Sequence, residues 1–283
     1  MTETLAVVHS LVRQGRRRLG GWQLRRTTVI GATPILVLSA LKAAIYGHPS
    51  SEERAWVDRI EDLRARYEAS DEPLVVEDFG SGRETAAQES NLTTRTLGRM
   101  TLSSKPPDWA YLLFRLVREF RPKTCVELGA CVGVSASYQA AALELNGGAG
   151  RLVSLEGSSV LADWSSRTLR ELGLDDRATI RVGRFSDTLS DTVQELAPLQ
   201  WAFIDGHHDE LATLQYMEQI MPTLATEAIL VFDDIDWSVG MRRAWQQVVE
   251  DPRFCLTVDL RSVGLAVVSA ETLPRQALSI SHA

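Results

Sequence analysis

The feature that most constrains the fold is a regular alternation of short apolar runs and helical patterns after Pro106. Strands that alternate with helices in this way form a parallel sheet covered by helices on both faces. The last two runs have no helical pattern between them and predict an antiparallel hairpin at one edge. We therefore predict an α/β fold with a Rossmann-like, doubly wound, mainly parallel seven-stranded sheet and an antiparallel C-terminal hairpin. The predicted strands are 124–128, 151–156, 178–182, 200–205, 227–233, 255–260 and 263–269.

We place this domain at residues 106–283. The chain before it divides into two parts. Residues 1–75 predict an N-terminal helical extension, because apolar residues recur at helical spacing through 51–68. Residues 76–105 are rich in glycine, serine and threonine and show little periodicity. A stretch of this kind is typical of a long loop that acts as a lid or linker.

The N-terminal extension contains an apolar stretch, 27–47, that follows several arginines. Basic residues before an apolar stretch occur in signal sequences and membrane anchors. However, Pro34 and Lys42 interrupt this stretch, and a spanning helix needs about 20 mostly apolar residues. We predict an amphipathic or buried helix, and leave open a peripheral membrane contact and a homodimer contact.

Composition excludes some classes of protein. The net charge of −7 argues against a nucleic-acid partner that is bound by general attraction to phosphates. The three cysteines form no CxxC pair, which argues against a disulfide framework or a zinc site and favours a cytoplasmic protein.

The first candidate site is the glycine-containing turn after the first predicted strand. This turn carries Glu127, Gly129 and Gly133, a pattern that differs from the G-x-G-x-x-G fingerprint of dinucleotide sites. Glu127 would repel a pyrophosphate but suits a cationic ligand, and Glu156 ends the next strand, where ribose hydroxyls are bound. A cationic adenosine ligand points to S-adenosylmethionine. The alternative is a tight turn without any ligand.

Four ordered motifs carry a resemblance to a known family: VELGACVGVSASYQAAAL, RLVSLEG, FIDGHHDE and LVFDDIDWSVGMRRAW. Together they resemble the class I S-adenosylmethionine-dependent methyltransferases, in the O-methyltransferase-like branch. DFGSGR, at 78–83, is similar to a segment that precedes the core in one bacterial subgroup. The resemblance implies cofactor contacts from Glu127, Gly129, Gly133, Ser135, Glu156, Gly183 and Phe185.

The second candidate site is a group of acids at the ends of the fourth and fifth strands. Asp205 ends one strand and Asp233 with Asp234 ends the next, so we expect the three carboxylates to meet. Clustered acids need a cation, and oxygen ligands favour Mg²⁺. The resemblance implies a Mg²⁺ site at these positions, as in the metal-dependent members. Two alternatives stay open: Asp234 caps the next helix, or Asp205 contacts the cofactor.

Two adjacent histidines follow Asp205 in the same motif. A histidine titrates near neutrality and can take a proton from a hydroxyl. The resemblance favours His207 as the general base, beside Asp205, and His208 as a residue that orients the loop.

The expected function is therefore S-adenosylmethionine-dependent O-methylation of a small-molecule hydroxyl, with Mg²⁺ assistance. The alternatives are a metal-independent N- or O-methyltransferase and a non-catalytic protein that binds a cofactor or a partner. An oxidoreductase is disfavoured by the glycine pattern. DDID, at 233–236, mimics the Asp-rich motif of prenyl-transfer enzymes, but it follows a strand, whereas those motifs lie on helices.

Overall fold

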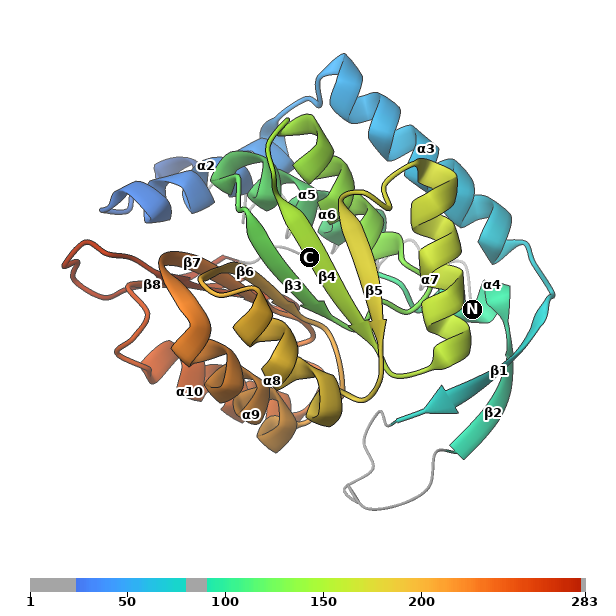
Figure 1. Ribbon diagram of the computed structural model, residues 1–283. Coiled ribbons are helices and arrows are strands. Elements are labelled where there is room, and N and C mark those ends of the chain that lie inside the picture. The colour runs from blue at the N-terminus through green and yellow to red at the C-terminus, as the bar shows by residue number, and fades with distance from the viewer. Residues whose placement is uncertain (1–23, 80–90, 281–283) are drawn as a thin grey trace, which may run out of the picture.

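The computed structural model describes residues 24–79 and 91–280, and its main body is one sheet between two layers of helices (Figure 1). The sheet order is β10-β8-β9-β7-β6-β3-β4-β5. The five strands from β5 to β7 are parallel, β9 is antiparallel to its neighbours β7 and β8, and β10 is parallel to β8. The strands are β3 (Thr124–Leu128), β4 (Arg151–Glu156), β5 (Ala178–Val182), β6 (Leu199–Ile204), β7 (Leu224–Phe232), β8 (Leu256–Asp259), β9 (Gly264–Val268) and β10 (Gln276–Ser279).

The predicted fold class is confirmed, with one strand added. The seven predicted strands and the antiparallel hairpin, β8 with β9, are present. The sequence analysis missed β10, which pairs with β8 at the edge of the sheet. This strand has only four residues, QALS, so it is too short to show a strand pattern by itself.

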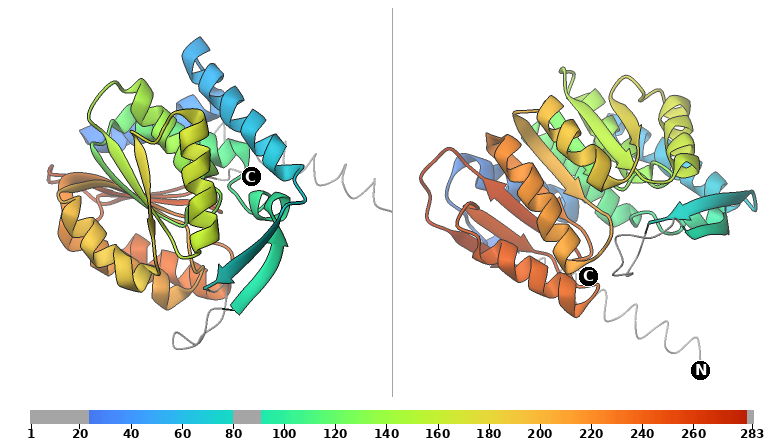
Figure 2. Two further views of the ribbon diagram at one scale, coloured as in Figure 1. Left: turned by 45° about the vertical axis from the view of Figure 1, so that its right-hand side comes forward. Right: turned by 60° about the horizontal axis from the view of Figure 1, so that its bottom comes forward.

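The helices cover both faces of the sheet, as the turned views show (Figure 2). One layer holds α5 (Pro107–Phe120), α6 (Val134–Leu145) and α7 (Ser159–Leu172). The other holds α8 (Phe185–Glu195), α9 (Glu210–Ile220) with a short 3₁₀ turn at Met221–Thr223, and α10 (Val239–Glu250).

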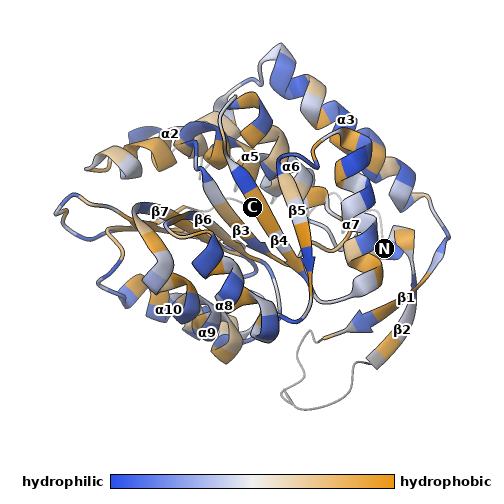
Figure 3. Cartoon of the chain, in the orientation of Figure 1, coloured by the Kyte–Doolittle hydropathy of each residue, from blue (hydrophilic) through white to orange (hydrophobic). Residues whose placement is uncertain are grey.

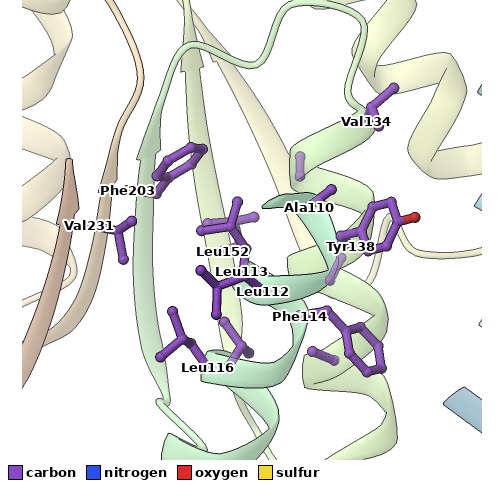
Figure 4. Close-up of a cluster of buried hydrophobic side chains, with 14 of the residues drawn as sticks. Ala110, Leu112, Leu113, Phe114, Leu116, Val134, Tyr138, Leu152, Phe203 and Val231 are labelled. Atoms are coloured by element: carbon purple, nitrogen blue, oxygen red, sulfur yellow. The ribbon is translucent and has the colours of Figure 1, made fainter. Parts of the chain in front are cut away.

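The strands supply side chains to both layers because successive residues point to opposite faces. Trp201 and Phe203 belong to the core beneath α5 and α6, whereas Ala202 and Ile204 belong to the core beneath α8 and α9. The strands are accordingly apolar at nearly every position, and the polar residues lie at the outer helix faces and at the strand ends (Figure 3). Figure 4 shows part of the first core, where side chains of α5 and α6 pack with Leu152, Phe203 and Val231 of β4, β6 and β7.

The described part of the N-terminal extension forms two helices, α2 (Ala32–Tyr46) and α3 (Ser51–Glu68). Ser50 and Glu53 form a capping box at the start of α3, and buried Glu53 also accepts a hydrogen bond from Arg115 of α5 at 2.6 Å. No helix among residues 24–79 and 91–280 is long and apolar enough to cross a membrane. The arginines at positions 13–18 lie outside the described residues.

Regular elements, which a long loop would not contain, lie at both ends of the segment 76–105. Strands β1 (Pro73–Asp78) and β2 (Asn91–Thr96) form a separate antiparallel pair, followed by α4 (Leu97–Thr101). Most of β2 is polar, NLTTRT, and no apolar alternation marks it, because only β1 of this pair reaches the core, through Leu74 and Val76. Residues 80–90, which include most of the DFGSGR motif, lie outside the described residues.

Candidate functional site

Three backbone hydrogen bonds extend the parallel sheet beyond the ends of its strands. Gly129 N donates to Leu155 O at 2.9 Å, and Asp205 N donates to Leu128 O at 3.0 Å. Asp233 N donates to Ile204 O, also at 3.0 Å. The carboxyl ends of β4, β3, β6 and β7 are thus joined into one edge, where the candidate residues of both predicted sites lie.

The turn after β3 needs glycine at position 129. Gly129 has a φ of 99°, and a Cβ added there would lie 2.0 Å from the carbonyl oxygen of Asp205. The turn continues through Cys131, at φ 49°, to Gly133, at φ 88°, which precedes α6. The backbone of the β3 turn therefore lies directly against the end of β6, where a side chain would prevent the approach.

Glu127 lies fully buried beneath this turn, within a chain of hydrogen bonds. Its carboxylate accepts from Gln139 Nε2 at 2.8 Å and from Ser154 Oγ at 2.5 Å. Trp201 Nε1 donates to Gln139 Oε1 at 2.7 Å and completes the chain. Burial raises the pKa of Glu127 to about 7, and the hydrogen bonds from Ser154, Ser135 and Gln139 oppose the shift.

Glu156 organises the glycine turn from the end of β4. Its two carboxylate oxygens accept from Cys131 N at 2.8 Å and from Ser158 N at 2.9 Å. Burial raises the pKa of Glu156, and these backbone donors oppose the shift. A carboxylate has about four lone-pair sites, so two remain for donors from a ligand.

Phe79 closes one side of this region, and the sequence analysis did not single it out. Its ring lies where a Cβ on Gly157 would stand, at 2.6 Å, and the Arg184 guanidinium lies 5.0 Å from the ring centroid. Gly183, at φ 139°, precedes Arg184 and turns the chain there. Phe185 points instead into the core, against Gly206 and Tyr216.

A lysine, Lys105, lies beside two acids of the second site, Asp233 and Asp234. Lys105 Nζ forms an ion pair with Asp233 Oδ2 and lies 3.7 Å from Asp234 Oδ1. Burial raises the pKa of Asp205 and the charge of Asp234 adds to the shift, while Lys105 and His208 oppose it. Lys105 thus supplies positive charge at the place where the sequence predicts a metal ion.

The arrangement of these side chains does not fit a divalent metal. Within the described ranges, no three His, Cys, Asp or Glu side chains are placed to hold a metal ion together. The Lys105 ammonium occupies Asp233 Oδ2, an oxygen that a metal at Asp205, Asp233 and Asp234 would require. The predicted Mg²⁺ site therefore lacks a free set of donors.

The two histidines differ in their surroundings. His207 Nδ1 is 2.6 Å from Tyr216 Oη, its ring packs edge-on to Phe185, and it forms a hydrogen bond with the backbone of Phe79. Burial lowers the pKa of His207. His208 Nδ1 instead faces Asp234 Oδ2 at 3.7 Å. Both residues have left-handed backbone, with φ of 64° and 43°.

Comparisons with known proteins agree with this architecture. A family model described as a methyltransferase domain matches residues 126–235, from Val126 in β3 to Ile235 after β7. A catechol O-methyltransferase from Niastella koreensis is 28% identical over 137 residues, which are 48% of this chain. The chain spans 60% of the length of that curated relative.

Solved structures show the same fold. The O-methyltransferase from Bacillus cereus, in complex with SAH, has a TM-score of 0.55 and 17% identity, over 84% of this chain and 100% of that chain. A putative O-methyltransferase from Klebsiella pneumoniae has a TM-score of 0.53 and 20% identity, over 83% of this chain and 97% of that chain. The sheet order and the turn after β3 therefore define a Rossmann-like methyltransferase fold. Residues 126–235 thus match the methyltransferase-domain family, and the chain shares the fold of these O-methyltransferases.

The contact of Gly129 with Asp205 can be tested by Gly129→Ala. We expect a loss of about 3 kcal/mol in the free energy of unfolding, because a Cβ at φ 99° would also collide with a carbonyl oxygen. Gly147→Ala is a matched control, since Gly147 has φ 65° but no atom within 4 Å of the added Cβ. It should lose only about 1 kcal/mol. Equal losses in urea unfolding would show that the contact is unimportant.

The pKa of Glu127 has a consequence for stability in the absence of ligand. A carboxyl whose folded pKa is about 7 instead of 4.5 binds its proton more tightly when folded, so stability falls as pH rises through that interval. Glu127→Gln cannot titrate, so its free energy of unfolding should fall less over this range than that of the wild type. Urea unfolding followed by tryptophan fluorescence measures this difference, with exposed Glu72→Gln as the control. Parallel curves for wild type and Glu127→Gln would contradict the assignment.

Proposed function

We propose that this chain is an S-adenosylmethionine-dependent methyltransferase that methylates a hydroxyl of a small molecule. The observation that carries the proposal is the joined edge of β3, β4, β6 and β7, which presents the glycine turn, Glu156 and the acid cluster in one place. The match of residues 126–235 to a methyltransferase-domain family and the O-methyltransferases among the relatives support it.

The cofactor would lie over the glycine turn. Glu156 accepts hydrogen bonds from the two ribose hydroxyls while it keeps its bonds to Cys131 N and Ser158 N. The negative charge of Glu127, beneath the same turn, favours the cationic methionine end. Gly129, Gly133 and Ser135 line this end, Gly183 turns the chain beside the adenine, and Phe79 closes the ribose side. Phe185, which the resemblance implied near the adenine, packs in the core.

The reaction then takes place at Asp205 and the residues around it. With the cofactor bound, an acceptor oxygen would attack its methyl carbon, the carbon–sulfur bond would break, and the bonding electron pair would stay on the sulfur, which becomes a neutral thioether. The acceptor's proton passes to a base of the protein. Mg²⁺ assistance has no part in this scheme, because Lys105 already pairs with the acids that would hold the ion.

We assign the base to His208 and a positioning role to His207. His208 lies beside Asp234 and contributes to the electrostatic environment of Asp205. His207 is held by Tyr216, Phe185 and the backbone of Phe79, so it ties the β6 turn to the end of β1. Trp237 is 65% exposed, and its ring centroid lies 5.8 Å from that of His208. This exposed ring offers an apolar contact to an acceptor.

The cofactor site can be tested by titration calorimetry with S-adenosylhomocysteine. Glu156→Gln removes the negative charge that accepts the ribose hydroxyls, so we expect the affinity to fall by about 10- to 100-fold. Glu72→Gln, on the exposed surface, should leave the affinity unchanged. A wild-type chain that binds no ligand at millimolar concentration would refute the proposed function.

The two histidines can be separated by steady-state kinetics with a small phenol or another accepted hydroxyl compound. His208→Gln should lower kcat by about 10²- to 10⁴-fold, as expected for loss of a general base. His207→Gln should mainly raise KM and lower the melting temperature, because its contacts position the turn. The reverse pattern, a large loss of kcat only in His207→Gln, would return the base to His207.

A further inference from the structure

The acid cluster has one feature that its predicted metal role does not explain: a nearly buried lysine lies within it. Lys105 is one of only three lysines in a chain with 30 lysines and arginines. Its side chain is 11% exposed and meets Asp233, whose side chain is 1% exposed. Burying an ammonium is costly unless it is well paired, so this placement needs a compensating gain.

The backbone around Lys105 is fixed by the N-terminal extension. Arg64 of α3, itself buried, donates from Nη1 to Lys105 O at 2.7 Å. Glu61 orients Arg64 at 3.1 Å and accepts a hydrogen bond from Tyr138 of α6 at 2.7 Å. The proline after Lys105 also restricts its backbone to extended conformations. These contacts fix the backbone of Lys105 beside the acid cluster.

The same segment touches the cofactor turn. Ser103 Oγ donates to Met100 O at 2.6 Å and lies 3.8 Å from Cys131 Sγ. Cys131 Sγ in turn lies 3.6 Å from Met100 O. The segment that carries Lys105 is therefore packed against the residues that would face the methionine end of the cofactor.

One oxygen of the cluster is still open. Asp233 Oδ1 is buried and has no hydrogen-bond partner among the residues that the structure describes. Ser104 Oγ, in the residue before Lys105, is likewise buried without a hydrogen-bond partner among the described residues. Buried polar atoms are costly without partners, so this place suits a ligand that carries a hydrogen-bond donor.

We propose that Lys105 is the resident cation of this cluster: its ammonium takes the position of the predicted metal ion and leaves Asp233 Oδ1 for a donor group of the methyl acceptor. This inference rests on the proposed function. Lys105 neutralises Asp233 and Asp234 through Nζ, and Arg64 and the following prolines keep it there. The extension that carries α3 thereby takes part in building the acceptor site.

Mn²⁺ binding tests the proposal without any methyl transfer. The EPR signal of free Mn²⁺, titrated against the chain without other ligands, reports the metal that is bound. The wild type should bind no stoichiometric Mn²⁺ below about 1 mM, because the ammonium repels it. Lys105→Ala leaves the acids unpaired and should bind one Mn²⁺ at least about tenfold more tightly. Adding Asp234→Asn to Lys105→Ala should abolish that gain.

The controls separate this proposal from the proposed function. Lys123→Ala removes an exposed lysine and should behave as the wild type does. Calorimetry with S-adenosylhomocysteine and circular dichroism show whether Lys105→Ala is folded with its cofactor site intact. If Lys105→Ala fails to fold, Lys105→Met replaces it. The Mn²⁺ titration of the wild type tests the proposal even without a folded variant. Wild-type binding of one Mn²⁺ at micromolar concentration overturns the proposal, as does an absence of binding in both the wild type and a folded lysine variant.

Turnover gives a second readout. The wild type should keep its activity after treatment with a chelator. Lys105→Ala should lose about 100-fold in kcat, and Mn²⁺ should restore part of that loss. A wild type that loses activity with the chelator and regains it with Mg²⁺ would contradict the proposal, whereas failure to bind S-adenosylhomocysteine would instead refute the proposed function.

Discussion

The hydrogen bonds that continue the sheet past its strand ends determine where every candidate residue lies. Each links the residue after one strand to a residue at or next to the end of a neighbouring strand: Gly129 to Leu155, Asp205 to Leu128, and Asp233 to Ile204. A backbone bond of this kind fixes a residue more firmly than a side-chain contact, because no rotamer change can relax it. The cofactor turn and the acid cluster are therefore parts of one rigid edge.

That rigidity creates an electrostatic problem, and Lys105 resolves it. Three acids held at neighbouring strand ends repel one another, and burial adds to the cost of their charges. An ammonium that pairs with Asp233 and lies near Asp234 removes much of that cost. The lysine comes from outside the Rossmann-like core, and Arg64 of the extension holds its backbone. The extension therefore does more than pack against α5: through Arg64 it positions the lysine that pairs with the acids of the site.

Much of the fold could be predicted because the parallel sheet imposes strong patterns. Strand β3 and helix α6 appear at the predicted residues, since an apolar run, a glycine turn and a helical pattern follow one another without interruption. The missed strands β1, β2 and β10 are short, and β2 and β10 also alternate without an apolar run. The placement of Asp205, Asp233 and Asp234 at one edge of the sheet was also predictable, because adjacent parallel strands end there.

The sequence alone did not predict that the Lys105 side chain lies at that edge of the sheet. Lys105 lies in no motif, and its role depends on Arg64, which is 41 residues away in the chain. The contrast between His207 and His208 likewise depends on two left-handed residues in succession, which no local pattern indicates.

The most direct test is a crystal structure grown with S-adenosylhomocysteine and MnCl₂, with anomalous data collected at the manganese edge. We expect the ribose at Glu156, Lys105 Nζ between Asp233 and Asp234, and no anomalous peak among the acids. A manganese peak bound by Asp205, Asp233 and Asp234, with Lys105 displaced, would contradict this account.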